Sequence, residues 1–333
     1  MILVTGATGL VGGNLLWHLL QQNERVTAIR RSTSNLEPLR TIFRFYTSNP
    51  EEYLAKINWK IADVLDIKSI ENVMSGISIV YHCAAVVSLG NKSDVMLDTN
   101  VTGTKNIVEA AIKAKVIKFC FVSSIAACGK ATDNRLIDEN SVWKENSDTS
   151  FYSQSKFYSE QEVWKGIKNG LNAIIVNPGV ILGISGNETG SSQLFSPVRK
   201  GLMFYTNGGS GYIDVLDVVK SMIVLTNSEI SGNRFILVSE NCSNKDILSW
   251  MADGFGKRRP FIPIGKRLLW LFGIISEISG KIFHFKPLID RNTAQSATNR
   301  KYYSSTKIKN EINFEFTPIE KCIQDVCAFM LKN

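Results

Sequence analysis

The sequence has few of the residues that stabilise small secreted or metal-dependent domains. Its 333 residues include six cysteines and three histidines, and no two cysteines have the Cys-x-x-Cys spacing. We therefore expect neither a metal site nor a disulfide framework, and predict free thiols in a reducing compartment. The 24 glycines and eight prolines are ordinary numbers for a globular protein and exclude collagen-like and disordered chains.

Long apolar runs are also absent. The longest, residues 268–275, spans eight positions, whereas a membrane-spanning helix needs about 20. Glycines follow the first four residues, so no signal peptide is recognised. We expect a soluble, cytoplasmic protein without membrane contact. For the apolar segment 266–285 we favour a buried helix pair or a wall of the substrate pocket. A helix lying in an anionic membrane surface and a dimer surface are the alternatives.

An excess of positive charge is present but scattered. The chain has 38 Lys and Arg against 30 Asp and Glu, a net charge of +8. Basic blocks such as Lys257-Arg258-Arg259 are too short for a nucleic-acid-binding arm. We therefore expect a small-molecule substrate and no nucleic-acid partner.

Short apolar segments alternate with amphipathic ones through the first 180 residues. The predicted strands are residues 2–4, 25–29, 58–62, 77–83, 118–122 and 173–176, and the predicted helices are residues 10–22, 67–74, 95–115 and 152–168. Apolar strands that alternate with helices are typical of a parallel sheet covered on both faces. The sequence therefore predicts the α/β class, with a doubly wound parallel Rossmann sheet.

The pattern changes after residue 182. Residues 183–211 are rich in Gly, Ser and Asn and are predicted to be loop, while residues 212–219 and 235–238 are predicted strands that return to the sheet. Residues 243–333 look mainly helical and begin with Ser243-x-x-Asp246, a variant of the capping box. We expect residues 1–182 and 212–240 to form the Rossmann domain. Residues 183–211 and 241–333 are expected to form a smaller, mainly helical C-terminal substrate lobe.

A glycine-rich loop joins the first predicted strand to the first predicted helix. Glycines let the backbone turn sharply and approach a pyrophosphate, and the helix N-terminus offers N–H groups to it. The alternative is a tight turn that binds nothing. The loop predicts a dinucleotide site formed by Gly6, Thr8, Gly9, Leu10, Val11 and Gly12.

Two arginines, Arg30 and Arg31, follow the second predicted strand, and no acidic residue occurs before Glu37. A carboxylate there would accept hydrogen bonds from the ribose 2′-hydroxyl of NAD, whereas arginine suits the 2′-phosphate of NADP. We therefore favour NADP, with NAD as the alternative. Two solvated arginines that stack on adenine without selecting the cofactor would be the less specific interpretation.

Tyr152 and Lys156 lie one helical turn apart, and Ser123-Ser124 ends the strand 118–122. A phenol titrates near pH 10, and a neighbouring ammonium lowers its pKa, which suits it to proton transfer with a carbonyl oxygen. Taken alone, Tyr152 and Lys156 could be two exposed side chains on the surface of a helix, without a catalytic role. Ser124 is at the carboxyl edge of the sheet, where open α/β folds bind ligands. We expect Ser124 to hold the substrate oxygen and Ser123 to cap the turn.

Together these motifs resemble the extended branch of the short-chain dehydrogenase/reductase superfamily, the NAD(P)-dependent epimerase/dehydratase family. The resemblance covers nearly the whole chain. It also includes Asp63-Val64, His82-Cys83-Ala84-Ala85, Asn100-Val101-x-Gly103-Thr104 and Pro178-Gly179.

The resemblance implies a role for each matching residue. Tyr152 would be the general acid and base, Lys156 would tune it and bind the nicotinamide ribose, and Ser124 would orient the carbonyl. Asn100 would take part in a proton relay, whereas His82 is expected to be a packed strand-end residue. The remaining cofactor contacts implied are Asp63 and Val64 at the adenine, Ala84 and Ala85 along the cofactor, and Pro178 and Val180 near the nicotinamide.

Within this branch, sugar-nucleotide enzymes typically carry an arginine just before the segment that matches residues 212–217. Here Gly208-Gly209-Ser210-Gly211 precedes it. The chain looks more like dihydroflavonol reductases and hydroxysteroid dehydrogenases, so we expect an NADP-dependent oxidoreductase acting on an apolar carbonyl or alcohol. The alternatives are a sugar-nucleotide epimerase or dehydratase with tightly bound NAD, and a non-enzymatic cofactor-sensing protein. The helices that carry Asn100 and Tyr152 could pair two copies as a homodimer.

Overall fold

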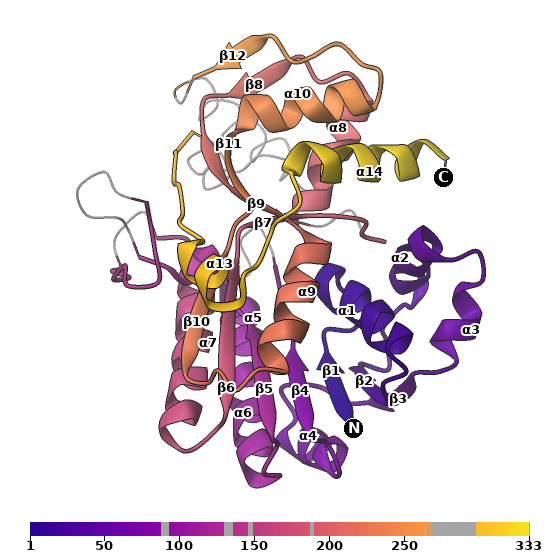
Figure 1. Ribbon diagram of the computed structural model, residues 1–333, viewed down its shortest axis with the longest axis vertical. Coiled ribbons are helices and arrows are strands. Elements are labelled where there is room, and N and C mark those ends of the chain that lie inside the picture. Colours follow the sequence, from indigo (N-terminus) through magenta and orange to yellow (C-terminus); the bar gives the residue numbers. More distant parts are fainter. Residues whose placement is uncertain are drawn as a thin grey trace.

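The computed structural model describes residues 1–87, 93–129, 136–145, 149–186, 190–265, 267 and 298–332. Its central sheet has seven strands in the order β10-β6-β5-β4-β1-β2-β3, all of them parallel (Figure 1). The strands are β1 (Ile2–Thr5), β2 (Val26–Arg30), β3 (Asn58–Ile61), β4 (Ile79–His82), β5 (Lys118–Val122), β6 (Ala173–Pro178) and β10 (Asn233–Leu237). The predicted Rossmann-like α/β fold is confirmed.

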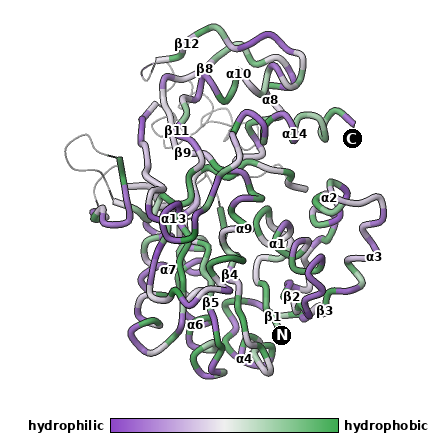
Figure 2. The backbone as a smooth tube through the Cα atoms, in the orientation of Figure 1, coloured by the Kyte–Doolittle hydropathy of each residue, from purple (hydrophilic) through white to green (hydrophobic). Residues whose placement is uncertain are grey.

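Helices cover both faces of this sheet. Successive side chains of a strand point to opposite faces of the sheet. In β1, Ile2 and Val4 therefore belong to one hydrophobic cluster and Leu3 belongs to another. The first cluster is shared with α1 (Leu10–Gln21), α2 (Glu37–Tyr46), α3 (Pro50–Leu54) and α9 (Val215–Thr226). The second is shared with α4 (Ile67–Met74), α6 (Gly103–Lys113) and α7 (Phe151–Lys168). Figure 2 shows hydrophobic residues along the central strands.

The long helix predicted for residues 95–115 is interrupted. It consists of α5 (Ser93–Leu97), a π-helical turn η1 (Asp98–Thr102) and α6. Single π-helical turns inside α-helices occur frequently at functional sites. Asn100 lies in this turn and is buried.

The smaller structural elements gather beyond the carboxyl ends of the central strands (Figure 1). Strands β7 (Val180–Leu182), β9 (Gly209–Asp214) and β11 (Glu240–Ser243) form one sheet, and β8 (Phe204–Thr206) pairs with β12 (Ile262–Ile264). A separate hydrophobic cluster joins the β7-β9-β11 sheet to α8 (Phe195–Arg199), α10 (Asn244–Gly254) and α14 (Ile319–Lys332). Helix α13 (Thr306–Ile312) packs against β10 instead.

Three sequence-based expectations are corrected. Residues 183–211 are not simply loop, because they include a 3-10 turn, η3 (Gly190–Leu194), as well as α8 and β8. Residues 212–219 are not one strand: β9 ends at Asp214, whose carboxylate accepts the Leu216 N–H at 2.9 Å and starts α9. Strand β9 also joins the small sheet rather than the central one.

None of the helices in the described part of the chain combines the length and hydropathy that crossing a bilayer requires. The apolar segment 266–285, for which the sequence leaves three interpretations, lies outside the described residues except for Arg267.

Helix α10 begins with the predicted capping arrangement. The Ser243 hydroxyl oxygen accepts the Asp246 N–H at 3.1 Å, and the hydroxyl donates to the Asp246 carboxylate at 2.6 Å. We expect Ser243→Ala to lower the free energy of unfolding by about 1 kcal/mol, because a helix N–H loses its acceptor. Urea denaturation measures this, with Ser243→Thr as the control that keeps the oxygen. An alanine variant as stable as the threonine variant would contradict the assignment.

Candidate active site

The glycine loop between β1 and α1 is shaped for close approach of a ligand. Gly6 has φ +65°, and a Cβ at Gly12 would lie 2.2 Å from the Gly6 carbonyl oxygen. Gly9 precedes the first helical residue, and no side chain caps this helix end. A pyrophosphate is therefore accommodated by the open backbone and by the N–H groups at the start of α1. Thr8, Leu10 and Val11 are half-buried beside it.

Beneath the loop, His82 joins three elements. Its ring nitrogens lie 2.7 Å from the Thr5 hydroxyl and 3.0 Å from the Thr104 hydroxyl, and the Ala84 N–H donates to Thr5. Burial lowers the pKa of His82 to about 3, and the Lys156 charge adds to this effect. His82 is therefore a neutral, packed residue that fixes the ends of β1 and β4.

At the end of β2, Arg30 is half-buried and Arg31 is exposed. The Nε atom of Arg30 is buried and has no hydrogen-bond partner among the described residues. The Arg31 N–H donates to the Ser34 hydroxyl at 3.1 Å, which shapes the turn that follows. A guanidinium nitrogen without a partner at this edge of the sheet is suited to donate a hydrogen bond to an anionic oxygen of a bound cofactor.

The residues predicted near adenine follow the adjacent strand β3. The Asp63 carboxylate accepts the Leu65 N–H at 3.0 Å, and the Val64 carbonyl accepts the Asn106 amide at 2.8 Å. Gly103 packs against Val64, because a Cβ there would lie 2.8 Å from a Val64 methyl group. Asp63 and Val64 are therefore held at the carboxyl edge of the sheet by contacts with neighbouring residues.

Ala84 and Ala85 follow β4 and are half-buried at the same edge. On the opposite side, Pro178 ends β6 and Val180 begins β7. Between them the Gly179 N–H donates to the Leu237 carbonyl at 2.9 Å, and a Cβ at Gly179 would lie 2.4 Å from the Gly211 carbonyl oxygen. Only glycine allows the two backbones to pass so closely.

The Tyr152 phenol lies beside the Ser124 side chain. Burial raises the pKa of Tyr152, while the polar Ser124 side chain acts in the opposite direction. The Ser124 hydroxyl oxygen accepts the Ala126 N–H at 3.1 Å, so Ser124, and not Ser123, caps the turn. The expectation for Ser123 was wrong because its hydroxyl donates instead to Glu160 at 2.7 Å.

Lys156 is buried, and its ammonium donates to the Val122 carbonyl at 3.0 Å. Burial lowers its pKa to about 8, and Cys83 and Glu160 oppose that shift. The expected lowering of the Tyr152 pKa by this ammonium is not found. The main influence on the pKa of the Tyr152 phenol is its own burial, because the Lys156 ammonium points to the end of β5.

Asn100 connects the segment after β4 to α7. Its side-chain oxygen accepts the Val86 N–H at 2.7 Å, and its amide donates to the Val86 carbonyl at 3.1 Å and to the Ser155 hydroxyl at 3.0 Å. The Asn100 carbonyl accepts the Thr104 hydroxyl at 2.6 Å. Through these contacts Asn100 fixes the segment after β4 against α7. Its part in a proton relay stays a prediction.

Sequence reasoning missed two buried polar residues, Glu160 and Asn177. Glu160 lies four residues after Lys156 on α7 and is 1% exposed, and Asn177 lies in β6 and is fully buried. The spacing of Glu160, one further turn along the Tyr152 and Lys156 face, was the available indication. A carboxylate on a surface helix would otherwise be expected to face solvent.

Several proteins resemble this chain along most of its length. A putative dihydroflavonol 4-reductase of Synechocystis sp. is 28% identical over 330 residues, which cover 97% of this chain and 92% of the relative. Cinnamoyl-CoA reductase 2 of Medicago truncatula is 25% identical and covers 97% and 89%.

Solved structures share the same fold. The crystal structure of gox2253 superposes with a TM-score of 0.81 at 26% identity and covers 100% of this chain and 98% of its own. UDP-glucose 4-epimerase of Thermotoga maritima superposes with a TM-score of 0.77 at 17% identity and covers 99% and 98%. The latter similarity concerns the fold alone.

Gly12→Ala is expected to weaken cofactor binding by at least about tenfold, because its Cβ would collide with the Gly6 carbonyl that shapes the loop. The matched control is Gly265→Ala, where nothing lies within 4 Å of the added Cβ. Fluorescence titration with NADPH measures both affinities. Equal affinity in the two variants would contradict the assignment of this loop as the cofactor cradle.

A family model described as the NAD dependent epimerase/dehydratase family matches residues 2–236. That span contains the glycine loop, Ser124, Tyr152 and Lys156. The chain therefore belongs to the NAD-dependent epimerase/dehydratase family and is an NAD(P)-dependent oxidoreductase of that family.

Proposed function

We propose that this chain is an NADP-dependent reductase that converts the carbonyl of a small apolar molecule to an alcohol, or the reverse. The observation that carries the proposal is the placement of the Tyr152 phenol beside Ser124 at the carboxyl edge of the Rossmann sheet. The names of the relatives, a dihydroflavonol reductase and a cinnamoyl-CoA reductase, support carbonyl reduction.

A nicotinamide cofactor held by the glycine loop and the Pro178–Val180 segment would supply the hydride to the carbonyl carbon, or would accept it in the reverse direction. Tyr152 provides the proton to the carbonyl oxygen. Its raised pKa keeps the phenol protonated at neutral pH, which is the form required of a general acid. Ser124 donates a hydrogen bond to the same oxygen and places it beside the phenol. The buried Lys156 ammonium adds a positive charge close to the alkoxide that develops.

The choice of NADP rests on Arg30 and Arg31. The buried Arg30 Nε atom lacks a partner, and the exposed Arg31 side chain is free to turn toward the same ligand. A 2′-phosphate would satisfy this donor with a charge-assisted hydrogen bond, which a neutral ribose hydroxyl supplies less strongly.

A sugar-nucleotide epimerase with tightly bound NAD is the second candidate. The superposition with UDP-glucose 4-epimerase is the observation in its favour. Against it, residues 208–211 contain no arginine to bind a nucleotide diphosphate. NAD retained by the purified protein, together with thermal stabilisation by UDP-sugars, would favour this candidate over a ketone reductase.

A homodimer formed through α7 and the helix that carries Asn100 stays a prediction. Phe151 and Tyr158 on α7 are exposed hydrophobic residues that such a contact would cover.

Tyr152→Phe should lower turnover of the best ketone or aldehyde by about 10³-fold or more, because the proton donor is removed while the ring remains. NADPH affinity should stay within about threefold. Oxidation of NADPH is followed by absorbance with a panel of ketones, aldehydes and sugar nucleotides. Retained turnover in this variant would show that another group donates the proton.

The double variant Arg30→Ala and Arg31→Ala should weaken NADPH by at least about tenfold and leave NADH nearly unchanged, because only NADPH carries the 2′-phosphate. Lys105→Ala, which removes an exposed positive charge on α6, is the control. Isothermal titration at two salt concentrations measures the ionic share of binding. An equal loss for both cofactors would refute the phosphate assignment.

A further inference from the structure

Glu160 is a buried carboxylate with four hydrogen-bond donors. One oxygen accepts the Ser123 hydroxyl at 2.7 Å and the Asn177 amide at 2.8 Å, and the other accepts Arg234 at 3.2 Å and Trp164 at 3.3 Å. The donors come from the segment after β5, from β6, from β10 and from α7 itself. An ionised carboxylate can accept all of these hydrogen bonds, because its two oxygens only accept and together have about four lone-pair sites.

The contacts on the first oxygen lead directly to the catalytic serine. The amide nitrogen of Asn177 that donates to Glu160 also lies 3.0 Å from the Ser124 carbonyl, to which it donates. Ser123 is the preceding residue and donates to the same oxygen of Glu160. The backbone of the Ser123-Ser124 turn is therefore held from both sides by one carboxylate, which fixes where the Ser124 hydroxyl points.

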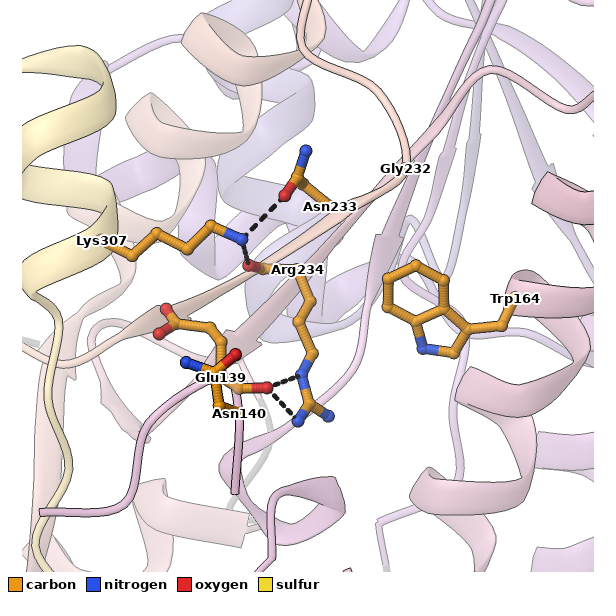
Figure 3. A pocket seen from close by; sticks show the side chains of 7 residues that line it. All are labelled: Glu139, Asn140, Trp164, Gly232, Asn233, Arg234 and Lys307. Atoms are coloured by element: carbon orange, nitrogen blue, oxygen red, sulfur yellow. Dashed lines mark hydrogen bonds between the residues drawn. The ribbon is translucent and has the colours of Figure 1, made fainter. Parts of the chain in front are cut away.

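The contacts on the second oxygen anchor Glu160 at the outer edge of the sheet. Arg234 also donates to the Glu139 carbonyl at 2.9 Å, and Lys307 donates to Asn233 and to the Arg234 carbonyl (Figure 3). These residues line a hollow of about 380 Å³. Because the cations in it already have protein partners, the hollow is the outer end of the Glu160 network rather than a second ligand site.

The charge of Glu160 also acts on Lys156, one helical turn away. Burial lowers the pKa of Lys156, and the nearby Cys83 and Glu160 are the groups that counter it. The thiol of Cys83 is itself kept neutral at physiological pH, because burial raises its pKa. That leaves Glu160 as the formal negative charge among these groups. Among the described residues, neutral His82 on β4, and Phe121 and the Val122 carbonyl on β5, also face Lys156. Facing Glu160 are Arg234 and the Cys128 thiol.

We propose that Glu160 is a positioning residue for the reaction: through Ser123 and Asn177 it holds the Ser124 turn beside Tyr152, and it places a negative charge one helical turn from the buried Lys156 ammonium. This inference rests on the proposed function of Tyr152, Ser124 and Lys156. It is separable from that function because two of its consequences are visible without substrate or cofactor.

The test compares the near-isosteric Glu160→Gln variant with Ser123→Ala, which removes one contact and keeps the charge. Lysine residues are labelled with ¹³C at Cε, and the Lys156 resonance is identified by its loss in Lys156→Met. The midpoint of its titration in the ligand-free protein should be near pH 8 in the wild type. It should fall by about one unit in Glu160→Gln and stay in place in Ser123→Ala.

Hydrogen–deuterium exchange tests the positioning of the turn. The peptide that contains Ser124 and Ala126 should exchange faster in both variants. Ser123→Ala removes the Ser123 contact, and in Glu160→Gln one amide oxygen replaces the two oxygens that accept four donors in the wild type. For the active enzyme, kcat at pH 7.5 should fall on the order of 10²-fold in Glu160→Gln, with NADPH affinity preserved. The alkaline limb of its pH profile should also move to lower pH, which a merely structural role of Glu160 would not cause.

Removing one partner of a buried ion pair can prevent folding. The double variant Glu160→Gln with Arg234→Gln removes both charges and should show the same lowered Lys156 midpoint. An unchanged midpoint together with unchanged exchange overturns the proposal. If no carbonyl substrate is found for the wild type, the proposed function fails, while the titration and exchange still decide whether Glu160 controls Lys156 and the serine turn.

Discussion

The active site depends on one constraint: the carboxyl ends of parallel strands meet at a single edge of the sheet. Strands β1, β4, β5 and β6 are neighbours in the order β6-β5-β4-β1, although their residues are far apart in the sequence. The glycine loop, the Ser124 turn and the Asn177-Pro178-Gly179 segment therefore lie along one edge of the sheet, the edge at which open α/β folds bind ligands. Helix α7 then crosses this edge with Tyr152 and Lys156 on the side toward β5.

Buried polar contacts keep this edge rigid without closing it. Thr5, His82 and Thr104 link β1, β4 and α6 beneath the glycine loop, and Asn100 links the chain after β4 to α7. Glu160 forms the third such connection, between α7, β6 and β10. The Asn177 side-chain oxygen has no partner among the described residues, but the hydrogen bonds that form these three networks are buried, and in a low-dielectric interior they are stiff and costly to break. Arg30 Nε, Asn177 Oδ1, Ser221 Oγ and Thr226 Oγ1 are the buried side-chain atoms without a partner among the described residues, and Arg30 Nε is the charged donor of this set, at the end of β2.

Much of this arrangement could be predicted because its signals are local. Apolar strands alternating with helices gave the order of the Rossmann elements, and the glycine loop had the correct neighbours on both sides. Helix α2 was not predicted, although Leu39, Ile42 and Phe43 form its buried face. The boundary between β9 and α9 was also missed. Residues 212–219 are apolar except for Asp214 and Asp217, and the cap at Asp214 separates a strand from a buried helix.

The wrong predictions at the site have a different origin, because they concern which group each polar side chain hydrogen-bonds. Ser123 and Ser124 are adjacent and chemically identical, and only the position of Glu160 decides which one caps the turn. The spacing of Tyr152 and Lys156 likewise cannot reveal that the ammonium turns to the Val122 carbonyl. Such choices depend on groups distant in sequence.

The central claim is that the Tyr152 phenol, which lies beside Ser124, faces the nicotinamide of a bound dinucleotide. A crystal structure of the chain with NADP⁺ measures this directly. The account predicts the nicotinamide ring between the Pro178–Val180 segment and Tyr152, with the phenol oxygen within hydrogen-bond reach of a carbonyl placed at the ring. A cofactor bound elsewhere, or a phenol turned into solvent away from the ring, would contradict it.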